Sequence, residues 1–298
     1  MAETEIQPQL FNFKGFNFAT DFIIPGYLET IEDFEVRDSD IVIVTYPKSG
    51  TVWTQNILCL ILYEDHRNGT GNISTFHRAH SVEYNLNNVD FTKEPSPRLL
   101  LSHLPYYLVP KGLRDRKGKV IYVYRNPKDA MVSLFHYNKM LKRFEDSFKL
   151  ECFMQRYLVG NVICNSIFDH VKGWYTHKNE FNILFLSYEE MIKDLRGVVL
   201  KICSFVGKPL SSQEVDKVVE QATFKNMKAD PRANFEVPIH RNAFKTEKIN
   251  HLRKGTIGDW KNIMTVSQSE RFDKAFQEKM KDITLKFIWD IKEIQNHD

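Results

Sequence analysis

The feature that most constrains this chain is residues 41–63, IVIVTYPKSGTVWTQNILCLILY, where an apolar strand pattern passes into an apolar helical pattern. The joint between the two patterns carries Lys48, Ser49, Gly50 and Thr51. Glycine lets a backbone approach an anion closely, and the first-turn N–H groups of a helix favour negative charge. Lys48 adds a cation on a flexible stem. The stretch therefore predicts a phosphate site, with a polar turn that only caps the helix as the alternative.

Further apolar runs predict the sheet around this joint. Residues 41–46, 98–102, 119–124 and 182–187 read as strands, and helical patterns follow the first, third and fourth. Three of the runs are almost continuously apolar, which is typical of strands covered on both faces in a parallel sheet. The sequence therefore predicts an α/β fold with a central parallel sheet flanked by helices. No linker divides the chain, so we expect a single domain over residues 1–298.

A polar residue stands at the end of each predicted strand: Lys48, His103, Arg125 and Tyr188. In open α/β sheets, ligands bind in the crevice outside the carboxyl ends of the strands. We therefore expect these four side chains to converge on one site. None of these strands ends in an aspartate, and the GxxxxGK[ST] phosphate loop is absent. Magnesium-assisted transfer from ATP or GTP is therefore disfavoured, although a nucleotide kinase-like enzyme stays as a rival.

Composition narrows the class of protein. The formal net charge of +3, from 41 basic and 38 acidic residues, does not indicate a general nucleic-acid binder. The four cysteines, Cys59, Cys152, Cys164 and Cys203, lie at no metal-ligand spacing, so we expect no metal. Cys59 and Cys203 lie in apolar helical runs, which indicates buried free thiols. The first residues carry acids where a signal peptide has bases, and no apolar run could span a membrane. These features predict a cytoplasmic protein.

Three segments together carry a family resemblance: TYPKSGTVWTQ, RNPKDAMVS and RKGTIGDWKN. They resemble the 5′-phosphosulfate loop, the 3′-phosphate segment and the C-terminal cofactor segment of the cytosolic sulfotransferases, in that family's order and spacing. The resemblance extends over residues 20–285. It implies a P-loop-like strand–loop–helix in a single α/β domain. The implied donor is 3′-phosphoadenosine 5′-phosphosulfate (PAPS), the product is the 3′,5′-bisphosphate (PAP), and no metal is required.

The resemblance also implies roles for two residues in the transfer step. Lys48 would stabilise the charge on the oxygen that leaves sulfur. His103 would be the general base that takes the proton of the acceptor hydroxyl or amine, for which a pKa near 6.5 is suitable. A lone histidine is more often structural, and that reading is the alternative.

The donor site that the resemblance implies draws on residues from along the chain. Its members are Lys48, Ser49, Gly50, Thr51, Val52, Trp53, Arg125, Ser133, Tyr188, Phe224, Met227, Arg253, Lys254 and Gly255. Each has a simpler reading: Arg125 could pair with Asp129, Trp53 could be core, and residues 253–255 could form an exposed basic loop. Phe224 and Met227 have the spacing of a helix core.

Residues 225–258 show little periodicity and contain many bases, which indicates a long loop that ends as a lid over an anion. The acceptor pocket is expected to draw on residues 80–92 and 232–250. Aromatic candidates for its wall, or simply for the core, are Tyr106, Phe135, His136, Tyr137 and Phe244.

Residues 261–270, KNIMTVSQSE, match the family's short dimer motif KxxxTVxxxE at every specified position, from Lys261 to Glu270. A homodimer of modest buried area is therefore expected. The chain departs from the family's common pattern at Leu101, where a lysine is frequent, and at Ala222 and His251, where a hydroxyl and an aromatic are frequent.

SHLPYYLVPKGL looks most like the branch of the family that favours amine acceptors, and a neutral Leu101 would repel a cationic amine less than lysine would. The expected function is therefore PAPS-dependent transfer of a sulfuryl group to a small apolar phenol, alcohol, steroid or amine. A protein that binds PAP or the acceptor without catalysis on the same fold is the second rival.

Overall fold

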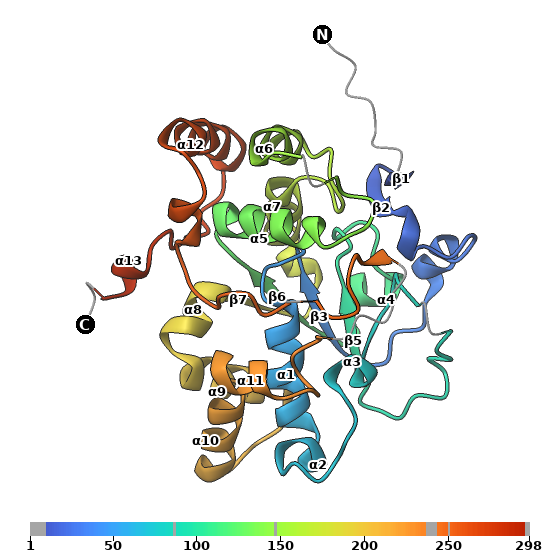
Figure 1. Cartoon of the computed structure of the whole chain (residues 1–298). Helices are drawn as coiled ribbons and strands as arrows, with labels where there is room; N and C mark the ends of the chain where they lie inside the picture. The colour runs from blue at the N-terminus through green and yellow to red at the C-terminus, as the bar shows by residue number, and fades with distance from the viewer. Residues whose placement is uncertain (1–9, 86–87, 146–147, 237–242, 250, 296–298) are drawn as a thin grey trace.

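The computed structural model describes residues 10–85, 88–145, 148–236, 243–249 and 251–295. Within them, five parallel strands form a central sheet in the order β4-β5-β3-β6-β7 (Figure 1). The strands are β3 (Ile41–Thr45), β4 (Ala79–Ser81), β5 (Leu99–Ser102), β6 (Lys119–Tyr124) and β7 (Ile183–Ser187). The predicted α/β fold with a central parallel sheet is confirmed. The short edge strand β4 was not predicted.

Both faces of the sheet are buried, which explains the continuous apolar runs. Along β3, Val42 and Val44 belong to one hydrophobic cluster, and Ile41 and Ile43 belong to the other. Successive side chains of a strand point to opposite faces, so each face receives every second residue. The first cluster includes residues of α5 (Pro127–Lys139), α6 (Leu150–Val159), α7 (Ile167–Thr176) and α12 (Val266–Met280). The second includes residues of α1 (Thr51–Leu62), α9 (Leu195–Val206) and α10 (Ser212–Gln221).

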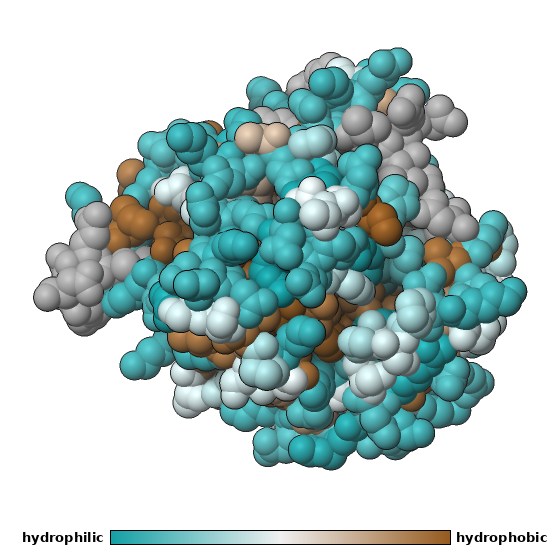
Figure 2. Space-filling view, turned by 90° about the horizontal axis from the view of Figure 1, so that it is seen from below, coloured by the Kyte–Doolittle hydropathy of each residue, from teal (hydrophilic) through white to brown (hydrophobic). Residues whose placement is uncertain are grey.

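Shorter elements complete the described chain. They are the antiparallel hairpin of β1 (Leu10–Phe13) and β2 (Phe16–Ala19), and the helices α2 (Glu64–Arg67), α3 (Thr75–Arg78), α4 (Lys111–Arg114), α8 (Tyr188–Lys193), α11 (Phe224–Ala229) and α13 (Ile291–Gln295). Short 3-10 helices cover Thr20–Phe22, Leu28–Asp33, Lys178–Glu180 and Asp259–Asn262. None of the described helices has the length and apolar character needed to cross a membrane. Figure 2 shows a mostly hydrophilic surface, with hydrophobic residues visible in a band recessed between hydrophilic ones.

A buried ion pair fixes the chain just before β3 and β5. Arg98 donates to Asp40 with 2.9 Å between Nε and Oδ1, and both side chains are almost fully enclosed. Arg98 also donates to the backbone oxygens of Glu35 and Phe91, at 2.8 and 3.1 Å. A buried charge is tolerated only when it is paired and hydrogen-bonded. This cluster meets that condition and ties three chain segments together.

The segment predicted as a long loop begins with a helix. The side chain of Thr223 accepts a hydrogen bond from the backbone N–H of Asn226 and so caps α11. After α11, Arg232 anchors the segment: its side chain binds Asp230, and its backbone oxygen accepts from the backbone N–H of Thr75 at 2.9 Å. The predicted loop is therefore irregular from residue 230 onward, and residues 237–242 and 250 lie outside the described part.

Candidate active site

The order of the strands places a crevice beside β3. Strands β5 and β6 lie on opposite sides of β3. The connections that leave the carboxyl ends of the strands therefore run in opposite directions on the two sides of β3, which opens a crevice there. Lys48, His103, Arg125 and Tyr188, which follow four different strands, all line one cavity of about 740 Å³. The convergence predicted from the strand ends is therefore present in the fold.

The loop between β3 and α1 has the backbone of an anion cradle. Lys48 has φ 70° and Gly50 has φ 109°, both in the left-handed region. A Cβ at Gly50 would lie 3.0 Å from Cδ2 of Tyr188, so a larger residue there meets strain and contact together. Lys48, Gly50, Thr51, Val52 and Trp53 line the cavity.

Ser49 differs from the other predicted donor-site residues because it does not line the cavity. Its side chain is fully buried, and its hydroxyl has no hydrogen-bond partner in the described part of the chain. Its backbone N–H donates to the oxygen of Tyr46 at 3.1 Å. The contact predicted for Ser49 stays a prediction.

Positive charge gathers around Lys48. Arg125 donates to the backbone oxygen of Lys48 at 3.1 Å, and the Lys48 ammonium lies 4.7 Å from the centre of the Tyr137 ring. Burial, and then the charges of Arg125 and Arg253, lower the pKa of Lys48 to about 8. An anion bound beside Lys48 would raise this pKa again, since an opposite charge favours the protonated amine.

The alternative reading of Arg125, an ion pair with Asp129, is only marginally present. The closest nitrogen–oxygen distance between them is 4.0 Å. The Asp129 carboxylate instead accepts from the backbone N–H groups of Gly258 and Trp260, at 2.7 and 3.0 Å. Arg125 donates to the backbone oxygen of Thr256 and lies 4.2 Å over the Tyr188 ring. Arg125 therefore remains directed into the cavity. Asp129 holds the backbone of residues 258–260 against α5, and with it the preceding segment of residues 253–255.

The basic segment, residues 253–255, is held in place by one carboxylate. Arg253 and Lys254 both bind Asp259, at 2.7 and 2.6 Å. Gly255 has φ 64°, and a Cβ there would overlap the ring of Phe224, so the backbone packs directly on that ring. Arg253, Lys254, Gly255 and Phe224 line the cavity, as do Met227 and Ser133.

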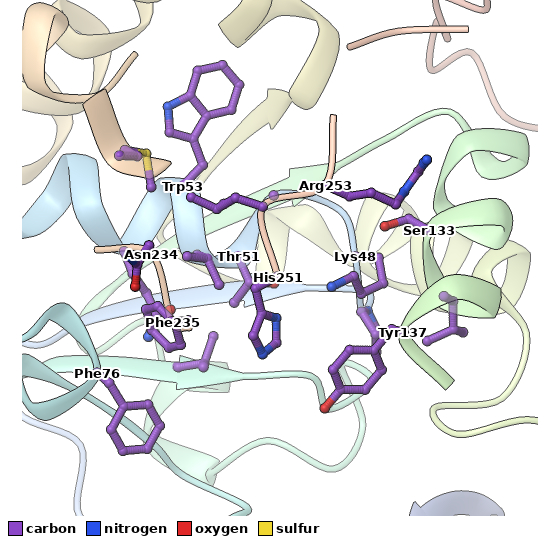
Figure 3. A pocket seen from close by; sticks show the side chains of 18 of the residues that line it. Lys48, Thr51, Trp53, Phe76, Ser133, Tyr137, Asn234, Phe235, His251 and Arg253 are labelled. Carbon is purple, nitrogen blue, oxygen red and sulfur yellow. The ribbon is translucent and has the colours of Figure 1, made fainter. Parts of the chain in front are cut away.

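Trp53 is held at the wall of the cavity by a hydrogen bond. Its Nε1–H donates to the backbone oxygen of Ala222 at 2.7 Å, and its ring meets Tyr188 edge to face at 5.4 Å. In Figure 3, Trp53, Ser133 and Arg253 lie on one side of Lys48, and Phe76, Phe235 and Tyr137 lie on the other. The cavity thus has a polar, basic half and an aromatic half.

His103 directly follows β5, and a backbone oxygen of the neighbouring strand β3 fixes its tautomer. Its Nδ1–H donates to the oxygen of Thr45 at 2.8 Å, because a carbonyl can only accept, and Nε2 is left as the basic nitrogen. Its backbone N–H donates to Glu83 at 2.6 Å, and its backbone oxygen accepts from His170 at 3.1 Å. These contacts from separate elements hold the ring in one orientation.

The pKa of His103 differs from the sequence-based expectation. Its pKa is lowered to about 4, mainly by burial; the hydrogen bond to Thr45 opposes this lowering and the charge of Lys48 adds to it. The expected value near 6.5 is therefore wrong for this site. The consequence is an imidazole that is unprotonated throughout the neutral range, so its Nε2 is free to accept, although it is a weaker base than an ordinary histidine.

Comparison with known proteins agrees with this geometry. The sulfotransferase domain family matches residues 38–284 of the chain. This chain belongs to the sulfotransferase family. It is 54% identical over 288 residues to the amine sulfotransferase of Oryctolagus cuniculus, covering 96% of each chain. It is 42% identical to the 3-alpha-hydroxysteroid sulfotransferase of Cavia porcellus, over 90% of this chain and 93% of the relative. The crystal structure of mouse sulfotransferase SULT7A1 complexed with PAP superimposes with a TM-score of 0.75 and 30% identity, over 92% and 95% of the two chains.

The aromatic half of the sulfotransferase cavity was only partly predicted. Tyr137 and Phe244 line it, whereas Tyr106 and Phe135 do not. Tyr106 stacks on His177 with ring centres 3.8 Å apart, and His136 lines a smaller recess nearby. Tyr84 and Phe235 also line the main cavity and lie within the predicted segments 80–92 and 232–250, whereas Phe22, Phe76 and Ile163 were missed. They come from separate loops and helices, and no spacing in the sequence marks them as a group.

The departures from the common sulfotransferase pattern also have places in the structure. Leu101, at the end of β5, lines the cavity, and Ala222 is buried with its oxygen bound to Trp53. His251 lines the cavity as well. The four cysteines are free thiols, as expected, with Cys152 exposed and the other three buried. Among the described residues, no group of three or more histidine, cysteine or acidic side chains is arranged to hold a metal ion.

Proposed function

We propose that this sulfotransferase takes PAPS as donor and transfers its sulfuryl group to an amine or hydroxyl of a small apolar acceptor, leaving PAP. The observation that carries the proposal is the joint lining of one cavity by Lys48, Arg125 and Arg253 on one side and the neutral His103 beside an aromatic wall. The donor is supported by the mouse structural relative, which is complexed with PAP.

The residues of the basic half fit a molecule with two phosphate-type groups. We assign Lys48 and the β3–α1 loop to the 5′-phosphosulfate, and Arg125, Ser133 and the segment 253–255 to the 3′-phosphate. The fit rests on charge: Lys48 has no carboxylate partner among the described residues, and the carboxylate nearest Arg125 is 4.0 Å away. Guanidinium forks suit phosphate oxygens. Trp53, Tyr188, Phe224 and Met227 then supply an aromatic and apolar site for adenine.

Two side chains carry the transfer in this proposal. His103 accepts the proton of the acceptor at Nε2, since its Nδ1–H is committed to Thr45. Lys48 stabilises the negative charge that develops on the oxygen leaving sulfur. A donor whose leaving group is a phosphate needs little protonation of that group, so the proposal includes no metal.

The acceptor half suits a small apolar molecule with one reactive polar group. Its walls carry Phe76, Phe235, Tyr137 and Phe244, and Leu101 adds no charge. The amine sulfotransferase relative at 54% identity favours an amine acceptor, and the hydroxysteroid relative at 42% favours an alcohol. We propose that both classes are accepted.

The wider setting of the protein is also a proposal. We propose a cytoplasmic enzyme whose single domain spans residues 1–298 and which pairs with a second copy through residues 261–270. Val266 in this segment has 75% of its surface exposed, which supports a contact there. Sedimentation of wild type beside Val266→Glu tests the pairing: a dimer that becomes monomeric supports it, and a wild-type monomer excludes it.

The proposed reaction is tested by transfer of radiolabelled sulfate from PAPS to a panel of phenols, aliphatic alcohols, steroids and arylamines, with EDTA present throughout. His103→Ala runs beside wild type. We expect metal-free turnover that the variant loses. PAP binding without any turnover would favour the non-catalytic rival, whereas ATP binding with a magnesium requirement would favour the kinase-like one. Absence of binding to both PAPS and PAP would overturn the donor assignment.

A further inference from the structure

The described cavity contains a second histidine, His251, placed between two aromatic rings. Its ring lies 5.4 Å from Tyr137 at an interplanar angle of 39°, and 5.9 Å from Phe235 at 73°. Figure 3 shows the ring between these two side chains, next to Lys48. His251 also lines the smaller recess of about 210 Å³ that Lys48 shares. It therefore lies where the aromatic half of the cavity meets the transfer point.

The ring of His251 has unused hydrogen-bonding capacity. Its Nδ1 is buried and has no hydrogen-bond partner among the described residues. Burial, helped by the charge of Lys48, lowers its pKa to about 3. The ring is therefore neutral near pH 7, so one of its nitrogens carries a hydrogen and the other can only accept a hydrogen bond. With the hydrogen on the enclosed Nδ1, Nε2 is the acceptor, and a ligand that donates to it gains affinity.

Hydroxyl and amine acceptors differ in what they can donate. A hydroxyl has one hydrogen, which His103 removes. A neutral primary amine has two N–H groups, so one remains after the first is directed at His103. Where the bound acceptor displaces water from its amine, that remaining N–H needs a protein acceptor, because an unpaired polar group loses its hydration without compensation. Aromatic walls do not provide a strong one.

We propose that His251 accepts this remaining N–H and thereby gives amines an advantage over hydroxyl compounds of the same shape. The inference rests on the proposed function, which it deepens by naming the residue that selects the acceptor class. In the transfer, the amine lone pair forms the N–S bond as the bond from sulfur to the phosphate oxygen breaks and its electron pair stays on that oxygen. The proton goes from nitrogen to Nε2 of His103. The sulfamate product keeps one N–H for His251.

The transfer needs the neutral amine, because only the free base carries the lone pair that attacks sulfur. Before the donor binds, the ammonium of Lys48, which lies near enough to shift the pKa of His251, disfavours a protonated amine here. Leu101 adds no charge of either sign.

The test compares 2-naphthylamine with 2-naphthol, which share one ring system and differ in the nucleophile. His251→Phe keeps an aromatic ring between Tyr137 and Phe235 but removes both nitrogens. We expect kcat/KM for the amine to fall about 10- to 100-fold, with the value for the naphthol within about threefold of wild type, since a buried group left unpaired discriminates strongly. His251→Gln, which keeps a hydrogen-bond acceptor, is expected to recover part of the loss.

A matched control is His136→Phe, which removes a histidine that lines the smaller recess but not the main cavity. We expect its amine-to-naphthol ratio to equal that of wild type. PAP affinity by calorimetry should be unchanged in all three variants. Equal losses for both acceptors in His251→Phe, or an unchanged ratio, would overturn the inference and leave His251 a packing residue. Wild type that sulfonates neither compound would overturn the proposed function, and this inference with it.

Discussion

The guanidinium of Arg125 donates a 3.1 Å hydrogen bond to the backbone oxygen of Lys48. The two residues follow β6 and β3, neighbouring strands of the sheet, so a side chain assigned to one end of the donor also holds the loop assigned to the other end. Lys48 has φ 70°, an unusual value for a residue with a side chain, and such conformations persist only when the surroundings hold them. Loss of Arg125 should therefore affect both phosphate sites.

Arg125→Lys keeps the charge but cannot bind the oxygens of Lys48 and Thr256 while also presenting a fork to a phosphate. We expect the PAP dissociation constant to rise about 10- to 100-fold, in line with the loss of charge-assisted hydrogen bonds. Isothermal calorimetry measures it. Arg116→Lys serves as control, because Arg116 is exposed and its side chain donates to the backbone oxygen of Asn179, away from the cavity. Equal affinities in the two variants would argue that charge alone suffices.

The pH profile of the reaction should have limits set by His103 and Lys48. His103, whose pKa is lowered to about 4, loses its role as base only when pH falls through about 4. Lys48, whose pKa is lowered to about 8, loses its charge as pH rises through about 8. We expect kcat/KM for PAPS to be level between these limits and to fall outside them. An aliphatic alcohol should be the acceptor, because it does not titrate in this range.

The pH dependence of kcat/KM reports the pKa values of the free enzyme, and that of kcat reports those of the enzyme–substrate complex. Bound donor favours the protonated form of Lys48, so the alkaline limb of kcat should lie at higher pH than that of kcat/KM. An acid limb near 6.5 in both parameters would show that His103 has the ordinary pKa of histidine, against the lowering caused by its burial.

Gly255→Ala should weaken donor binding through a clash. The added Cβ would overlap Cδ2 of Phe224, in a backbone with φ 64°. Strain of this kind costs about 1–3 kcal/mol, so we expect the PAP dissociation constant to rise about 5- to 150-fold. Calorimetry with PAP measures the effect.

Gly26→Ala is the matched control for Gly255→Ala. Gly26 also has a positive φ, of 77°, but a Cβ there would have nothing within 4 Å. Gly26→Ala therefore has the strain of a positive φ but no steric clash of the added Cβ. If both variants bind PAP as wild type does, the contact between Gly255 and Phe224 does not shape the donor site.

Asp40→Asn should destabilise the whole fold without touching the cavity. Removing one charge of a buried pair leaves the other uncompensated, which typically costs about 3–5 kcal/mol. Denaturant unfolding followed by circular dichroism measures the loss. Asp216→Asn, which breaks the exposed pair with Arg196, should leave the unfolding midpoint in place. A small loss of stability in Asp40→Asn would mean that the backbone oxygens of Glu35 and Phe91 are enough to satisfy the buried guanidinium of Arg98.

The sheet could be predicted because burial on both faces requires continuous apolar runs along the strands. The positions of Lys48, His103 and Arg125 followed from the rule that ligands bind at strand ends. The pKa of His103 could not be predicted, because it depends on burial and on the approach of Lys48, both of which are tertiary. Phe22 and Phe76 in the cavity wall were missed for the same reason: these residues are distant in sequence, and each alone resembles ordinary core.

One short segment of the chain serves both halves of the cavity. His251 contacts the aromatic rings of the acceptor half, and Arg253 follows closely on the same backbone and faces the basic half. A ligand that shifts this segment on one side therefore also shifts the wall that the other ligand meets. Any resulting coupling between donor and acceptor affinities is reciprocal, so each ligand would change the affinity of the other by the same factor.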